Sequence, residues 1–200
     1  MKITIPHMGN VYIAVKILFD GLGIDYVIPP LNNKEALSLG SKYSPDEMCL
    51  PFKLMIGNYI AGIKNGADTI LLVGSCGPCR FGYYCEMSRE ILQDNGYDMD
   101  VLTLELPNGD IKEFLRRIKM LTGNKNILRV LKAIKKATDI SIKLDELDKL
   151  SYKIRPREKE HGKTDWVMKK FHHQILKVKG HKETLNCINK TKKELENIEI

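Results

Sequence analysis

The stretch TILLVGSCGPCRFGYYCEMSREILQDN, residues 69–95, decides how the rest of the chain is interpreted. Residues 69–73 form a short apolar run of the kind found in buried strands, and Gly74-Ser75 ends it. A helical pattern starts near Gly82 and stops before Gly96, with apolar side chains recurring on one face. Cys76, Cys79 and Cys85 fall within ten residues, in the turn and at the start of the helix. The stretch therefore predicts a strand, a thiol-rich turn and a helix in direct succession.

The same alternation of strand and helix patterns extends back to the N-terminus. Residues 31–43 have a loop-like composition, and the SPDE run that follows fits a capping box with Ser44 as N-cap of one short turn. Strand–helix–strand units assemble into parallel sheets, so we expect an α/β fold, Rossmann-like, with a mainly parallel four-stranded sheet and a helical C-terminal extension. The predicted strands are 2–5, 25–28, 69–73 and 101–106, and the predicted helices between them are 11–22, 51–65 and 82–95.

The chain changes character near Pro107. Residues 1–107 hold 8 Lys/Arg and 12 Asp/Glu, a net charge of −4, whereas residues 108–200 hold 24 and 13, a net charge of +11. The second part contains only helical patterns. We therefore predict a cysteine-bearing Rossmann-like lobe over 1–107 and a basic helical segment over 108–200. Its expected helices are 111–121, 126–137, an extension at 145–150 after a break, 164–176 and 184–197.

The basic segment raises nucleic-acid binding as an alternative. Lysines and glutamates are interspersed along it, and no recognition motif accompanies them. A solvated helical face, or a docking surface for an acidic redox partner, fits this pattern better. No stretch is apolar enough to span a bilayer, and the N-terminus does not read as a signal peptide, so we expect a cytoplasmic protein with no membrane contact.

Four of the five cysteines lie between positions 49 and 85: Cys49, Cys76, Cys79 and Cys85. Each lies where a loop leads into a helix, and such loops gather at the carboxyl edge of a parallel sheet. Clustered thiols in a reducing compartment favour a metal or iron–sulfur site. The spacing C-x26-C-x2-C-x5-C matches neither zinc ribbons nor ferredoxins. We predict an iron–sulfur cluster, with zinc as the alternative metal and simple burial of the cysteines as the alternative without one.

Thioredoxin-like dithiol chemistry is a further alternative, because Cys76-Gly77-Pro78-Cys79 stands between a strand and a helix. Three features disfavour it. Ser75 occupies the place of the tryptophan found in thioredoxins, no later strand pair with a cis-proline follows, and Cys49 and Cys85 would have no role. The dithiol interpretation therefore ranks below the metal site.

The run SPDEMCLPFKLMIGNYIAGIKNGADTILLVGSCGPCRFGYYCEMSREILQDNGYD, residues 44–98, resembles small proteins related to 2-hydroxyacyl-CoA dehydratases and their activases. These proteins are often labelled CoA-substrate-specific enzyme activase-related, or CoA protein activases. The resemblance covers about residues 1–107, and IRPRE at 154–158 and GKTDW at 162–166 also fit it. This long run is more specific than the cysteine spacing.

The resemblance implies a Rossmann-like lobe whose cysteines hold a cluster of the 4Fe-4S type or larger. Cys49 and Cys76 match the best-supported ligand positions, and Cys79 and Cys85 are further candidates. In the dehydratase systems an ATP-hydrolysing activase passes a low-potential electron to such a component, and the dehydratase removes water from a 2-hydroxyacyl-CoA. The implied function is low-potential electron transfer, or radical dehydration or reduction of an acyl-CoA substrate.

The chain differs from these relatives in two ways, and each difference leads us to expect a partner protein. Relatives usually continue into a second Rossmann-like lobe, whereas this chain ends at Ile200, so we expect another chain to supply that lobe or a partner subunit. The phosphate-binding pattern G-x-x-x-x-G-K-[ST] is absent, so ATP hydrolysis is expected of a partner activase.

Four other side chains are candidates for substrate binding or for hydrogen bonds to cluster sulfur. His7 lies in the first strand–helix loop, on the same sheet edge as the cysteines. Glu47, Lys53 and Arg80 flank the cysteines in sequence. Exposure to solvent explains these charged residues equally well.

Overall fold

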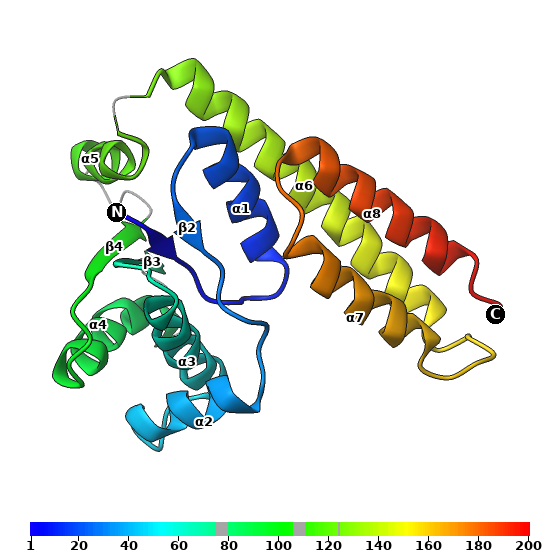
Figure 1. Cartoon of the computed structure of the whole chain (residues 1–200), viewed down its shortest axis with the longest axis horizontal. Helices are drawn as coiled ribbons and strands as arrows, with labels where there is room; N and C mark the ends of the chain where they lie inside the picture. Colours follow the sequence, from blue (N-terminus) through cyan, green and yellow to red (C-terminus); the bar gives the residue numbers. More distant parts are fainter. Residues whose placement is uncertain (75–79, 106–110, 124) are drawn as a thin grey trace. The chain divides into compact units, whose positions relative to one another are not determined.

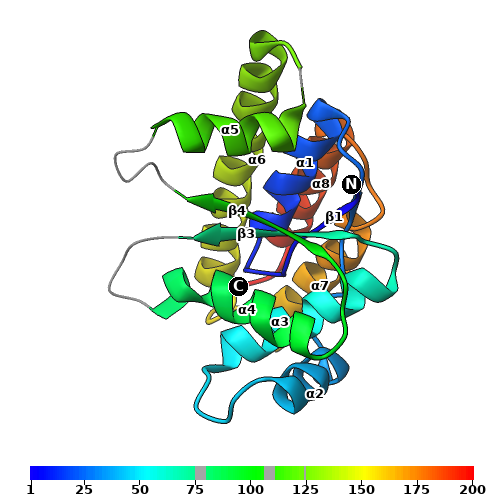
Figure 2. The same cartoon turned by 90° about the vertical axis from the view of Figure 1, so that its left-hand side faces the viewer.

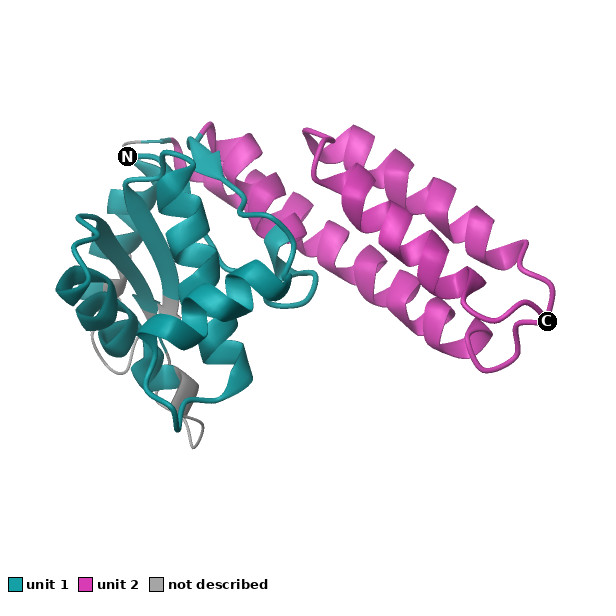
Figure 3. Ribbon diagram, turned by 60° about the horizontal axis from the view of Figure 1, so that its bottom comes forward, with its two compact units in different colours: residues 1–12, 24–125 teal, residues 13–23, 126–200 magenta. Residues whose placement is uncertain are grey.

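The computed structural model describes residues 1–74, 80–105, 111–123 and 125–200 (Figure 1). It divides into two compact units, which Figure 3 colours separately. The first unit comprises residues 1–12 and 24–125, and the second comprises residues 13–23 and 126–200. The predicted boundary between residues 107 and 108 lies outside the described residues and stays a prediction.

The first unit is an α/β structure built on one sheet, as the sequence predicts. Its four strands are all parallel and lie in the order β2-β1-β3-β4. The strands are β1 (Ile3–Thr4), β2 (Tyr26–Val27), β3 (Thr69–Gly74) and β4 (Asp100–Glu105), and the helical elements are α2 (Lys34–Tyr43), α3 (Leu50–Lys64), the 3₁₀ turn η1 (Arg80–Tyr83), α4 (Tyr84–Asp94) and α5 (Ile111–Thr122).

The longest strand pair, β3 with β4, runs in register from Thr69 opposite Asp100 to Gly74 opposite Glu105. Helices α3 and α4 cover one face of this pair, and α5 lies on the other face (Figure 2). Apolar side chains of α3, β3 and α4 form one buried set, here called the α3–α4 core. Its members are Phe52, Met55, Ile56, Tyr59, Ile60, Ile70, Leu72, Tyr84, Cys85, Leu92 and Met99.

Helix α2 occupies most of the segment 31–43, where a loop is expected from the sequence. The expected loop is therefore wrong. The Asn33 side chain caps it by accepting a hydrogen bond from the Ala36 N–H at 2.9 Å. Helix α2 packs so closely on α3 that a Cβ atom on Gly40 would overlap the Lys53 carbonyl oxygen, and one on Gly57 would overlap the Ala36 carbonyl oxygen. This close packing stabilises α2. Packing of this kind is invisible to local propensity.

The predicted capping box at 44–47 is also wrong. The Ser44 N–H donates to the Gly40 carbonyl at 2.9 Å, so Ser44 ends α2 instead of starting a helix. Residues after it form a turn in which the Met48 N–H donates to the Pro45 carbonyl at 3.1 Å. The predicted short turn before Cys49 is therefore present without the predicted cap.

The described residues of the second unit form helices joined by turns and loops, with no strand among them. It combines most of α1 (Val11–Leu22) with α6 (Ile127–Ile154), α7 (Lys163–Ile175) and α8 (His181–Glu196). The break expected in α6 is absent, because buried Ile140 and Leu144 continue the helical period across it. Helix α7 begins after Gly162 and not at Thr164. The Glu158 carboxylate accepts the N–H groups of both residues, at 2.6 and 2.8 Å, and so satisfies this helix start.

A buried lysine satisfies the opposite end of α7. The side chain of Lys16, on α1, is only 3% exposed. Its ammonium group donates to the carbonyls of Ile175 and Leu176, each at 3.0 Å, and to that of Val178. Burial lowers the pKa of Lys16, and nearby Asp20 opposes this shift. A cation at a helix C-terminus complements the negative end of the helix dipole.

Candidate functional site

The sheet order places a topological switch point between β1 and β3. From β1 the chain moves to β2 on one side, then crosses to β3 on the other. In open parallel sheets, ligands bind outside the carboxyl ends of the strands at such a point. His7 follows β1, and the segment 75–79 with Cys76 and Cys79 follows β3 in the sequence. The candidate site is therefore the edge where these two strands end.

A closed set of hydrogen bonds holds the His7 loop. The backbone N–H of His7 donates to Asn58 Oδ1 at 3.0 Å, and its carbonyl accepts from Asn32 Nδ2 at 3.4 Å. The Asn58 amide in turn donates to Asn32 Oδ1 at 2.8 Å. Asn58 is only 1% exposed on α3. It therefore fixes the loop after β1 to α3, the helix whose N-cap residue is Cys49.

The His7 ring is itself mostly buried. Its Nε2 lies 2.6 Å from the Pro29 carbonyl oxygen, and its ring meets Tyr12 edge-on with centroids 4.5 Å apart. A carbonyl oxygen can only accept, so Nε2 carries the proton. These contacts orient the ring at the carboxyl end of β1, where the sequence places it. Its role in binding stays a prediction.

Cys49 is the N-cap residue of α3 and lies partly buried against the α3–α4 core. Its Sγ atom is 2.6 Å from the hydroxyl oxygen of Tyr84, the first residue of α4. The loop before one helix thus meets the start of another. The positive end of a helix dipole favours thiolate over thiol at such a position.

Cys85, the second residue of α4, belongs to the α3–α4 core and is 6% exposed. Its thiol donates to the Gly82 carbonyl at 3.5 Å. The pKa of Tyr59 is raised well above its ordinary value, mainly by burial and to a lesser extent by the electrostatic effect of Cys85. The Tyr84 ring packs on Phe52, with centroids 4.5 Å apart. Cys49 and Cys85 therefore share one apolar environment. Tyr84 contacts Cys49 and is the residue before Cys85 in the sequence.

Cys76 and Cys79 lie outside the described residues, as does the side chain of Arg80. The described residues include no group of three or more His, Cys, Asp or Glu side chains that could hold a metal ion. Two of the four predicted ligands are thus placed on one core and two are not placed. The donors present are sulfur atoms beside an apolar wall, which suits an iron–sulfur cluster or zinc. The ligand set itself stays a prediction.

Two predicted charged residues lie near Cys49 along the chain. Lys53, in the first turn of α3, donates its N–H to the Cys49 carbonyl at 3.3 Å and its ammonium to the Asp46 carbonyl at 3.1 Å. It thereby ties down the loop before Cys49. Glu47 is exposed in that loop. Their contact with a substrate stays a prediction.

Sequence reasoning missed Tyr84 and Asn58. Tyr84 carries a hydroxyl inside an apolar core, directly before a predicted ligand. Asn58 is an amide in the otherwise apolar middle of α3. A polar group at an inward helical position is the signal that would have identified each of them.

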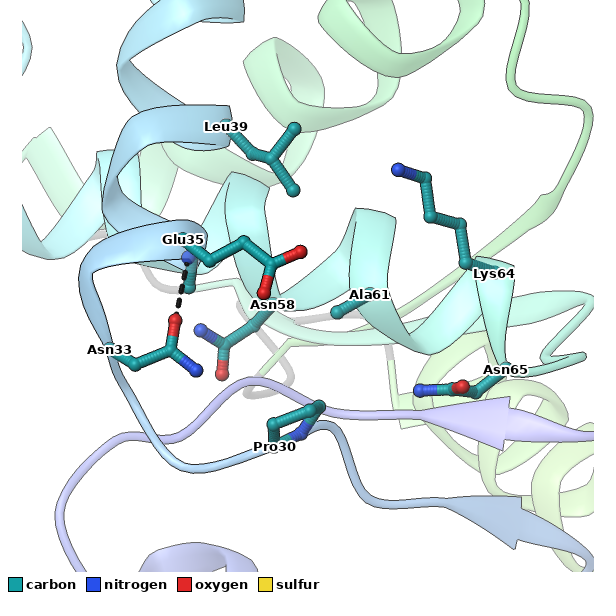
Figure 4. Close-up of a pocket in the computed structure, with 9 residues that line it drawn as sticks. Pro30, Asn33, Glu35, Leu39, Asn58, Ala61, Lys64 and Asn65 are labelled. Atoms are coloured by element: carbon teal, nitrogen blue, oxygen red, sulfur yellow. Dashed lines mark hydrogen bonds between the residues drawn. The ribbon is translucent and has the colours of Figure 1, made fainter.

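A hollow lies between α2 and α3 (Figure 4). Its volume is about 180 Å³, and its lining combines amide, charged and apolar side chains. Asn58 lines it, so the hollow and the His7 loop share one residue. The lining residues are Pro30, Asn33, Glu35, Ala36, Leu39, Asn58, Ala61, Lys64 and Asn65.

Part of the chain is similar to a known protein family. Residues 2–73 match the family described as "CoA enzyme activase uncharacterised domain". The matched segment runs from β1 almost to the end of β3 and includes His7, Glu47, Cys49 and Lys53. No curated protein matches the chain. Among the described residues, no helix combines the length and apolar character needed to cross a membrane.

Proposed function

From the match of residues 2–73 to the CoA enzyme activase-related family, we propose that this chain carries an iron–sulfur cluster of the 4Fe-4S type. Cys49, Cys76, Cys79 and Cys85 are the proposed ligands. The cluster serves low-potential electron transfer in a dehydratase- or reductase-like system that acts on an acyl-CoA. ATP hydrolysis belongs to a partner activase, since this chain has no phosphate-binding loop motif. The remaining wall of the site comes from a partner subunit or second lobe, and the system works in the cytoplasm.

The contact between Cys49 and Tyr84 carries this proposal. It joins the start of α3 to the start of α4, although the two residues are 35 positions apart in the sequence. Cys85 therefore lies on the same core as Cys49. The other two thiols belong to the five residues that connect β3 to η1. A shared site for all four is the simplest reason for such a distribution.

The described residues support a thiolate site in three ways. The start of α3 favours negative charge near Cys49. Phe52 and Tyr84 keep water from one side of the thiols. The Tyr84 hydroxyl can donate a hydrogen bond to the Cys49 sulfur, a contact that tunes thiolate ligands. A bound cluster would supply one-electron chemistry at this edge of the sheet.

Purification without oxygen tests the proposal. We expect a brown protein with broad visible absorption, several iron atoms per chain and matching acid-labile sulfide. A colourless protein with one zinc per chain would contradict it and indicate a structural site. Insulin reduction that survives Cys49→Ala but is lost in Cys76→Ala would contradict it in favour of dithiol chemistry.

A further inference from the structure

Helix α6 carries two apolar faces. One face is buried within the second unit and includes Val130, Ala133, Ile140, Leu144 and Leu147. At 100° per residue, a second apolar set falls on roughly the opposite side. Its side chains are largely exposed: Ile127 (65%), Leu131 (55%), Ile134 (47%) and Ile142 (53%). A helix at the surface of a globular protein normally has a single apolar stripe.

A groove borders the exposed stripe. It lies between α1 and α6 within the second unit and has a volume of about 260 Å³. Ile134 belongs to both the stripe and the groove. The lining residues are small or apolar: Ala14, Val15, Leu18, Ile134, Ala137, Thr138 and Ser141. The exposed stripe and the groove together are here called the α6 face.

The other edge of the stripe is basic. Residues 127–143 contain five Lys/Arg and one acidic residue, Asp139. Exposed Lys132 and Lys135 lie beside the stripe, on the side away from the groove. The one carboxylate, Asp139, lies 3.1 Å from Nε2 of His181. An occupant of the α6 face therefore meets apolar side chains along its centre and positive charge along one edge.

We propose that the α6 face docks an amphipathic helix of another protein, with its apolar ridge in the groove and a row of Asp or Glu against Lys132 and Lys135. Helices recognised in apolar grooves present anchors three and four residues apart, which matches the spacing of the stripe. Acidic flanks complement the basic edge and fix the register of the bound helix.

Charge disfavours a second copy of this chain as the occupant. An antiparallel two-fold pairing would set Lys132 and Lys135 against the same lysines of the other copy. A parallel pairing would set them against the apolar groove. Either arrangement places ammonium groups beside like charge or apolar surface. The concave groove also suits a helical ridge better than a flat lipid surface. Since no thiol takes part, this inference does not depend on the proposed cluster.

A designed peptide tests the inference on the full chain. The probe is a fluorescein-labelled helical peptide of about 20 residues, with leucines three and four residues apart and glutamates flanking them. A matched peptide carries lysine in place of every glutamate. Fluorescence anisotropy should show that the acidic peptide binds at least about tenfold more tightly than the basic one.

Three variants sharpen the test. The double variant Lys132→Glu, Lys135→Glu should reverse the preference between the two peptides. The double variant Leu131→Ser, Ile134→Ser should weaken binding of the acidic peptide by about tenfold or more, since the leucine anchors of the peptide lose apolar contact. The double variant Lys192→Glu, Lys193→Glu, at exposed positions of α8, makes the same change in charge away from the face and should leave binding unchanged. Circular dichroism confirms that each variant is folded.

Four outcomes would overturn the inference. Equal binding of both peptides, or binding of neither, would exclude a helix with acidic flanks as the specific occupant of the α6 face. Binding to phosphatidylcholine–phosphatidylserine vesicles that is lost in Leu131→Ser, Ile134→Ser assigns the face to a membrane. A dimer in sedimentation that dissociates in the same variant assigns it to a second copy.

Discussion

The Sγ atom of Cys49 lies 2.6 Å from the hydroxyl oxygen of Tyr84. This contact joins the N-terminal ends of α3 and α4, two helices that pack on the same face of the sheet. Tyr84 also packs its ring on Phe52 and directly precedes Cys85. One tyrosine thus connects two of the predicted ligands and the core beneath them.

Replacing Tyr84 with phenylalanine separates its two roles. Tyr84→Phe keeps the ring contact with Phe52 but removes the hydroxyl beside Cys49. We expect the free energy of unfolding to fall by about 1 kcal/mol, the usual net worth of one hydrogen bond. Urea denaturation under reducing, anaerobic conditions measures this change. Tyr83→Phe, at a neighbouring side chain that is 61% exposed, should have no effect. Equal losses in both variants would show that the contact has no energetic role.

The contact of α2 with α3 depends on two glycines. Gly40→Ala and Gly57→Ala each place a methyl group against a backbone oxygen of the facing helix. We expect each to destabilise the protein by about 1–3 kcal/mol, because backbone cannot yield as a flexible side chain does. Thermal or urea unfolding measures the loss. Ser38→Ala, at an exposed position on α2, is the control and should be neutral. Alanine variants as stable as the parent would argue against α2 packing on α3.

Lys16 should stabilise the end of α7 through its three backbone contacts. Lys16→Met keeps most of the aliphatic stem but leaves the carbonyls of Ile175, Leu176 and Val178 without the ammonium group. We expect a loss of about 2 kcal/mol in the free energy of unfolding, since the lost hydrogen bonds involve a charged donor. Lys177→Met, at an exposed position nearby, should change stability little. Equal stability of the two variants would contradict the cap.

The carboxyl group of Glu158 should make the stability of the protein depend on pH. Its hydrogen bonds to Thr164 and Gly162 lower its pKa from the ordinary value of 4.5. A carboxylate with a lowered folded-state pKa contributes stability above the unfolded pKa, and this contribution is lost as pH falls through the folded pKa. The stability difference between the parent and Glu158→Gln should therefore shrink as pH is lowered below 4.5.

Urea denaturation of both proteins across this acid range gives the comparison. Glu196→Gln, at an exposed position on α8, serves as the control and should follow the parent at each pH. A constant gap between the parent and Glu158→Gln would contradict the assigned role of the carboxylate.

The sequence predicts most of the sheet. The four strands are found close to their predicted positions, and α3 is displaced by one residue at each end. These elements carry strong local signals: apolar runs ended by glycine or proline, and a long 3.6-residue period. The loops that carry His7 and Cys49 follow from the same signals.

Three features could not be read from the sequence, because they depend on contacts distant along the chain. Helix α2 has a weak local pattern and is fixed by Gly40 and Gly57 against α3. The continuity of α6 depends on burial of Ile140 and Leu144 by other helices of its unit. Tyr84 fits the apolar face of the helix predicted over 82–95, and only the fold brings its hydroxyl to Cys49.

The proposed function requires cysteines of separate segments to hold one iron–sulfur cluster jointly. The most direct test is the iron and acid-labile sulfide content of the anaerobically purified chain, measured beside Cys49→Ala and Cys187→Ala. Cys187 lies on α8, in the other unit, and serves as the matched control. We predict several irons and sulfides per chain in the parent and in Cys187→Ala, and a large loss of both in Cys49→Ala. A parent without iron and sulfide, or a Cys49→Ala variant that keeps its full content, would contradict the claim.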